Sequence, residues 1–125
     1  MKKQGKDTRR SLHICGATVK VTFLQEDAGI SNGDDEVLLG CYKALSNEIF
    51  ISGQCDPSMK PRIFLHEVLH ACIGCSLGNT VASMAKKDQT EEVLVRCLDI
   101  GFYDLIRNPK NKWAVEYLLG TRKEP

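Results

Sequence analysis

The chain lacks both an excess of one charge and a long apolar run. Its 17 Lys and Arg residues nearly balance 16 Asp and Glu residues, so the formal net charge is +1. Nucleic-acid-binding domains usually carry a basic patch, of which this balance gives no sign. A membrane-spanning helix needs roughly 20 consecutive apolar residues, and no stretch approaches that length. We therefore expect neither a nucleic-acid partner nor a membrane.

A recognisable signal peptide is also missing. Residues 1–10, "MKKQGKDTRR", are basic like the start of such a peptide, but His13, Gly16 and Lys20 interrupt the segment that follows. The sequence therefore predicts a cytoplasmic protein with a flexible basic tail over residues 1–10. The remaining residues, 11–125, suffice for a single domain with one core.

The cysteines lack the secretory context that would favour disulfides. They occupy six positions: Cys15, Cys41, Cys55, Cys72, Cys75 and Cys97. In a cytoplasmic chain, reduced thiols are the usual state. Cys72 and Cys75 form a C-x-x-C that resembles half of a zinc knuckle, but a second pair at short spacing is absent. We therefore expect six free thiols, with Cys72 and Cys75 as structural residues of the core.

Strand patterns are confined to the first half of the chain. "ATVKVTFL", residues 17–24, alternates apolar and polar side chains like a half-buried strand. "VLLGCY", residues 37–42, and "EIFIS", residues 48–52, predict two further strands. A polar loop with a turn at residues 32–33 separates the first strand from the second. The short connection between the second and third strands predicts a hairpin.

Helical periodicity dominates the second half. It predicts three helices, the first with Asp56 or Ser58 as its cap and its end near residue 74, the others over residues 90–107 and 111–119. Pro61 is tolerated in the first turn of a helix, and Gly120 is a typical residue for closing one. Strands followed by helices indicate an α+β domain, with a three- or four-stranded sheet packed on the first two helices.

The first predicted helix contains an unusual polar group. "IFLHEVLHACIGC", residues 63–75, is apolar except for His66, Glu67 and His70. Buried charge and imidazole are costly unless something compensates them. At about 100° per residue, the three side chains share one face, while Cys72 and Cys75 point away from the two histidines. We expect Glu67 to lie beside a bound water rather than in the core.

H-E-x-x-H on a helix is a fairly specific metal-binding pattern. Histidines at i and i+4 lie one turn apart, so both rings can bind one Zn²⁺ ion. The neighbouring glutamate lies too far round the helix to be an easy ligand, but it can take a proton from a water bound to the metal. The sequence therefore predicts that His66 and His70 bind zinc and that Glu67 is the general base.

A catalytic zinc ion needs a third protein ligand and one open position. No third histidine follows His70 at a suitable spacing, so an acid from the second predicted helix is the better candidate. The candidates are Asp88, Glu91, Glu92 and Asp99. Glu91 lies on the inward apolar face of that helix, and Glu92 is turned about 100° away from it. We therefore favour Glu91 over Glu92.

With these residues the chain resembles small gluzincin-type zinc metallopeptidases of phages and prophages, and more loosely the ImmA/IrrE family. The resemblance runs from about Leu38 to Pro109 and includes "LGCYKALSNEIFIS", "FLHEVLHA" and "TEEVLVRCLDIGFYDLIRNP". It implies a zincin-like mixed sheet on two helices and the hydrolysis of peptide bonds. It further implies that His66, His70 and Glu91 bind zinc and that Glu67 is catalytic.

The resemblance leaves several functional questions open. Tyr42, Tyr103 and Tyr117 are all candidates for stabilising the oxyanion that forms during hydrolysis. The partner would be a protein or peptide substrate, either general or one regulatory protein. The alternative from another class is a non-catalytic module that uses zinc for stability and binds a regulatory partner. Such a module would not need Glu67.

Overall fold

The computed structural model describes residues 5–31, 37–77 and 87–125. Within the two long helices it places the backbone, but not the side chains, of residues 77, 87–93, 95, 96 and 99. The chain forms a mixed α+β structure, as expected from the sequence. In order, its elements are β1 (Thr8–Ile14), β2 (Ala17–Phe23), β3 (Ile30–Ser31), β4 (Val37–Leu38), β5 (Gly40–Lys43), β6 (Glu48–Ile51), α1 (Lys60–Leu77), α3 (Lys87–Arg107), the 3₁₀ turn η1 (Pro109–Asn111) and α4 (Lys112–Leu119).

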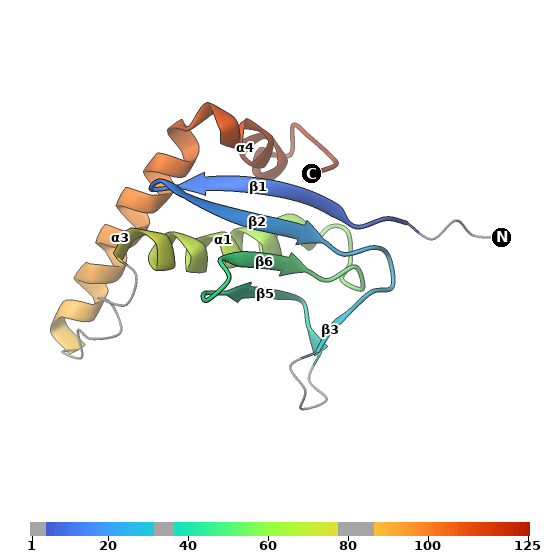
Figure 1. Ribbon diagram of the computed structural model, residues 1–125, viewed down its shortest axis with the longest axis horizontal. Helices are drawn as coiled ribbons and strands as arrows, with labels where there is room; N and C mark the ends of the chain where they lie inside the picture. Colours follow the sequence, from blue (N-terminus) through green and yellow to red (C-terminus); the bar gives the residue numbers. More distant parts are fainter. Residues whose placement is uncertain (1–4, 32–36, 78–86) are drawn as a thin grey trace.

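Four strands form the main sheet, in the order β1-β2-β6-β5 (Figure 1). β1 and β2 form an antiparallel hairpin, β2 and β6 run parallel, and β6 pairs antiparallel with β5. The β5–β6 pairing confirms the predicted hairpin. β3 and β4 form a separate two-stranded ribbon. Among the described residues, β1 and β5 are therefore the edges of the main sheet.

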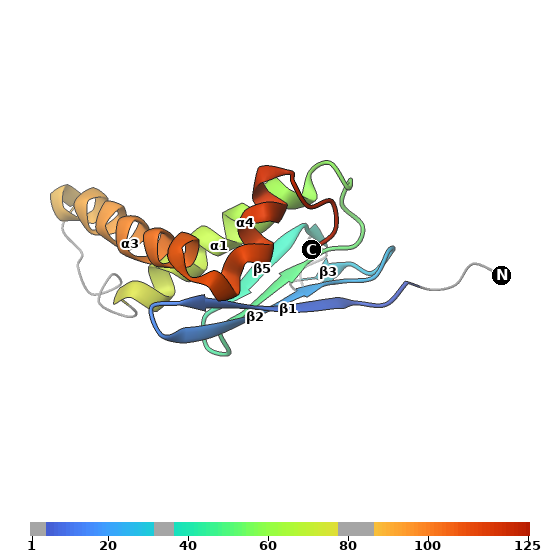
Figure 2. The ribbon, with the colours of Figure 1, turned by 90° about the horizontal axis from the view of Figure 1, so that it is seen from above.

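The helices of the described part cover one face of this sheet (Figure 2). Alternate residues of the strands point into this layer and are fully buried, among them Leu12, Val19 and Ile49. Phe64 of α1 packs against Phe23 of β2 and Tyr117 of α4, with ring centroids 5.5 and 5.7 Å apart. This aromatic cluster fixes α1 and α4 on the sheet.

The β1–β2 hairpin corrects the prediction of a basic tail. Residues 8–10 are the first part of β1 rather than a flexible segment, whereas residues 1–4 lie outside the described part. The two strands are joined by Cys15 and Gly16, both with positive φ (50° and 79°). Such a two-residue turn matches the right-handed twist of paired strands, although Asn-Gly is its usual sequence.

The helices begin and end near their predicted bounds. α1 begins at Lys60, with Pro61 as its second residue, and continues three residues beyond the predicted end at residue 74. α3 begins at Lys87, three residues before the predicted start at residue 90. Gly120, with a φ of 78°, closes α4 as predicted. The predicted turn at residues 32–33 lies outside the described part.

The fully buried Asn111 ties the helical layer to the edge strand β1. Its side-chain amide donates to the carbonyl oxygens of His13 (2.8 Å) and Leu105 (3.0 Å), and its Oδ1 accepts from the backbone N–H of His13 (2.8 Å). These hydrogen bonds satisfy buried polar groups that would otherwise destabilise the fold. No helix in the described part has both the length and the apolar character needed to cross a membrane.

Candidate metal site

Helix α1 presents a buried face and an exposed face. Phe64, Val68 and Cys72 are fully buried against the sheet and the other helices. Their spacing of four residues places them along one side of the helix. His66 and His70 lie on the opposite, exposed side. The division into a core face and a histidine face is therefore the one predicted from the sequence.

The two histidine rings lie close together on this face. The Nε2 atoms of His66 and His70 are 3.3 Å apart, and the ring planes meet at 73° with centroids 4.9 Å apart. Two nitrogens each about 2.0–2.1 Å from one tetrahedral zinc ion are roughly 3.3–3.4 Å apart. The two donors therefore already have the separation that a shared zinc ion requires.

Glu67 is more deeply placed than the sequence indicated. Its side chain is only 7% exposed, because it is turned towards β5 and covered by that strand. Burial raises the pKa of the carboxyl group above its ordinary value, while His70 and His66 lower it. In the described part, every fully buried side-chain oxygen or nitrogen has a hydrogen-bond partner. Since no hydrogen bond among the described residues involves the Glu67 carboxylate, its oxygens must retain contact with solvent.

β5 passes unusually close to α1 at two glycines. A β-carbon added at Gly40 would lie 2.8 Å from Ile63 Cγ2 and 3.0 Å from Glu67 Cγ. One added at Gly74 would lie 2.8 Å from the hydroxyl oxygen of Tyr42. Both approaches are tighter than normal van der Waals contact. Gly74 of α1 therefore packs against the edge strand β5.

The candidates for a third ligand all come from one helix. Asp88, Glu91, Glu92 and Asp99 all lie in α3, which packs against α1, but their side chains are outside the described part. Among the residues whose side chains are described, no three His, Cys, Asp or Glu residues come together as a metal site. Glu91 therefore stays a prediction.

The three candidate tyrosines occupy different environments. Tyr42 contacts α1 at Gly74 and donates a hydrogen bond to Asn47 Oδ1 at 2.8 Å. Tyr117 is buried in the aromatic cluster with Phe64, on the core face of α1. Tyr103 is 59% exposed on α3. Burial raises the pKa of Tyr42 and that of Tyr117 to about 12. Only Tyr42 is on the β5 side of α1, and its hydroxyl already has a partner.

The C-x-x-C residues are directed away from the two histidines. Cys72 is fully buried against Gly101 of α3, and Cys75 is half-buried near Tyr42 and Asn47. Burial raises the pKa of Cys72 to about 12 and also raises that of Cys75. Since the thiolate is the reactive and metal-binding form, both thiols are poor nucleophiles and poor ligands.

All six cysteines are free thiols in the structure, so a thiol titration should detect all six. A thiol reagent added to the denatured, unreduced protein should find about six groups. In the folded protein the exposed Cys15 should react first, and the buried Cys72 should react slowly because little of it is thiolate. A count of two or none in the denatured protein would instead mean disulfides and contradict the prediction of a cytoplasmic protein.

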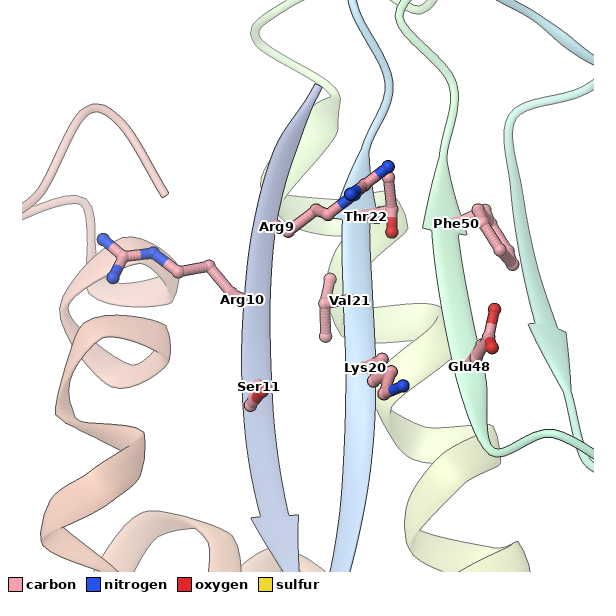
Figure 3. Close-up of a pocket in the computed structure, with 8 residues that line it drawn as sticks. All are labelled: Arg9, Arg10, Ser11, Lys20, Val21, Thr22, Glu48 and Phe50. Atoms are coloured by element: carbon pink, nitrogen blue, oxygen red, sulfur yellow. The ribbon is translucent and has the colours of Figure 1, made fainter. Parts of the chain in front are cut away.

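A hollow of about 660 Å³ lies on the open face of the sheet (Figure 3). The strands β1, β2 and β6 line it, mainly with Arg9, Ser11, Lys20, Thr22, Glu48 and Phe50. These residues alternate with the buried ones and therefore face away from α1. Lys20 and Glu48 are also partners in the strand register. This hollow is separate from the histidine face and carries more positive than negative charge, with Arg9, Arg10 and Lys20 against Glu48.

No family model, no curated protein and no solved structure matches the chain. The site must therefore be judged from its own geometry.

Sequence reasoning missed the role of β5 in this site. Gly40 was included in a predicted strand, yet its contact with Glu67 was not anticipated. A glycine inside a strand often marks a close approach of another segment, so the signal was present in "LLGCY". What approaches it, however, depends on the packing of the whole sheet.

Proposed function

We propose that this protein is a zinc-dependent metallopeptidase with a zincin-like fold. The observation that carries the proposal is the 3.3 Å separation of the Nε2 atoms of His66 and His70 on an exposed helix face. Two neutral imidazoles at this separation are a suitable donor pair for zinc. Glu91 of α3 is the proposed third ligand, on the basis of its sequence position.

The chemistry of the site would be divided between the ion and the chain. Zinc would supply a Lewis acid that activates water and polarises a peptide carbonyl group. Glu67 would accept a proton from the attacking water and later deliver it to the leaving amine. Its place on α1 beside His66 and His70 suits this function, because a general base must lie within reach of the proton that it accepts.

The free edge of β5 gives a place for an extended substrate. β5 runs beside α1, on the side to which Glu67 is turned, and its outer edge is unpaired among the described residues. An extended peptide can add to such an edge through backbone hydrogen bonds, without a fixed side-chain sequence. A peptide bound there would lie alongside the histidine face.

The test is whether zinc produces both activity and an open binding position. The metal-free protein, loaded with one equivalent of zinc, should cleave peptides of a denatured casein-type substrate, and a chelator should stop the cleavage. A peptide hydroxamate should bind to the zinc-loaded protein, because a catalytic site keeps one position open. If the zinc-loaded protein neither cleaves peptides nor binds the hydroxamate, the non-catalytic zinc module replaces the metallopeptidase.

A further inference from the structure

Where β5 contacts α1, Gly40 lies directly against Glu67. In the strand register Gly40 is opposite Ile51, which is fully buried, so Gly40 faces the helical layer. A β-carbon at this position would lie 2.8 Å from Ile63 Cγ2, 3.0 Å from Glu67 Cγ and 3.2 Å from Glu67 Oε1. Ile63 and Glu67 are one turn apart on α1. The backbone of Gly40 therefore closes the space between these two side chains.

The steric clash that a methyl group at position 40 would cause cannot be relieved at low energetic cost. Ile63 is β-branched, so its χ1 angle is strongly restricted in a helix. Glu67 Cγ is near the start of its side chain and cannot move without a change of rotamer. A larger residue at position 40 would therefore either displace β5 or swing the carboxylate out of its place.

We infer that Gly40 is a positioning residue, which holds the Glu67 carboxylate beside the histidine pair by leaving room for it against β5. The inference rests on the proposed function, because it assigns Glu67 the role of general base. It differs from a purely structural role, since a residue that only held β5 would affect stability and substrate binding but not the placement of the base.

A matched control exists at the other close contact of the same two elements. Gly74 of α1 lies against Tyr42 of β5, where an added β-carbon would be 2.8 Å from the hydroxyl oxygen and 3.2 Å from Cε1. Gly74→Ala therefore disturbs the same α1–β5 interface without touching Glu67. Both variants should lower stability, but only one should displace the carboxylate.

The first readout compares the zinc-loaded variants with the parent protein. Gly40→Ala should retain one zinc per chain and lower kcat by about 10- to 10²-fold with little change in KM, because small misplacements of a catalytic group have effects of this size. Gly74→Ala should lower kcat less than Gly40→Ala does, because it disturbs Tyr42 and leaves the general base in place. An unchanged kcat in Gly40→Ala, or an equal loss of kcat in both variants, overturns the inference.

The second readout is independent of activity. In urea unfolding of the zinc-free protein, Gly40→Ala should lower the midpoint concentration of urea. The same substitution should lower the midpoint less in a Glu67→Ala background, because the side chain opposite position 40 is shorter there. Equal drops in both backgrounds would mean that the methyl group at position 40 does not meet Glu67, and would overturn the inference.

A third variant covers the case in which Gly40→Ala does not fold. Gly40→Ala combined with Ile63→Ala removes the tightest contact and keeps the one with Glu67, so it should fold and still show a lower kcat than Ile63→Ala alone. If the zinc-loaded parent cleaves nothing and binds no hydroxamate, the proposed function and this role are both refuted. If the parent is active and Gly40→Ala has the same kcat, only the proposed role of Gly40 is refuted.

Discussion

The Glu67→Gln variant should hydrolyse peptides at least about 10²-fold more slowly than the parent protein, because general base catalysis typically contributes 10²–10⁴-fold to a rate. Glutamine has nearly the same shape as glutamate but cannot accept the proton. It should therefore fill the space beside Gly40 and Ile63 as the native side chain does. Zinc content and far-ultraviolet circular dichroism should match the parent, and kcat for a peptide substrate is the quantity to measure.

The matched control for this prediction is Glu48→Gln. Glu48 lies in β6 on the open face of the sheet, away from α1, so loss of its charge should leave kcat unchanged. Equal cleavage of a broad peptide library by the zinc-loaded parent and by Glu67→Gln would contradict the role of Glu67 as the base. The burial of Glu67 strengthens the test, because removing a charge from a partly desolvated position should not weaken the fold.

The first strand shows why part of the fold was not predictable from the sequence. Arg9 and Arg10 made the start of the chain resemble a solvated tail. Leu12 and Ile14, which follow at a spacing of two residues typical of a strand, are nevertheless fully buried. The turn that pairs β1 with β2 uses Cys15-Gly16, which carries a weaker turn signal than Asn-Gly. The parallel pairing of β2 with β6 joins segments far apart in the sequence, which local patterns do not encode.

The site was predictable where it depends on one helix. The spacing of His66 and His70 determines that both rings lie on one face of α1, whatever packs around it. The environment of Glu67 depends instead on β5, a separate strand that packs against α1 at Gly40 and covers most of the Glu67 side chain. A helical wheel contains no information about such a neighbour. The identity of the third ligand likewise depends on how α3 faces α1, which the sequence of neither helix encodes by itself.

Replacement of both His66 and His70 by alanine should abolish stoichiometric zinc binding. The two imidazoles supply the donor pair whose Nε2 atoms are 3.3 Å apart. Because both rings are exposed and no buried contact is lost, the zinc-free variant should fold about as well as the zinc-free parent. Metal analysis after dialysis against buffered zinc measures the loss directly.

A ligand that binds only the folded state stabilises it by an amount that depends on its concentration relative to Kd. For the parent protein, free zinc at about 100 times Kd should raise the free energy of unfolding by about 2.7 kcal/mol, and the double variant should show no such increase. His13→Ala is the control, since His13 is the only other histidine and lies on β1 rather than on α1. Its zinc content and its zinc-dependent stabilisation should equal those of the parent. Zinc retained at one equivalent per chain by the double variant would place the metal elsewhere, and the assignment of His66, His70 and Glu67 to one site would then be wrong.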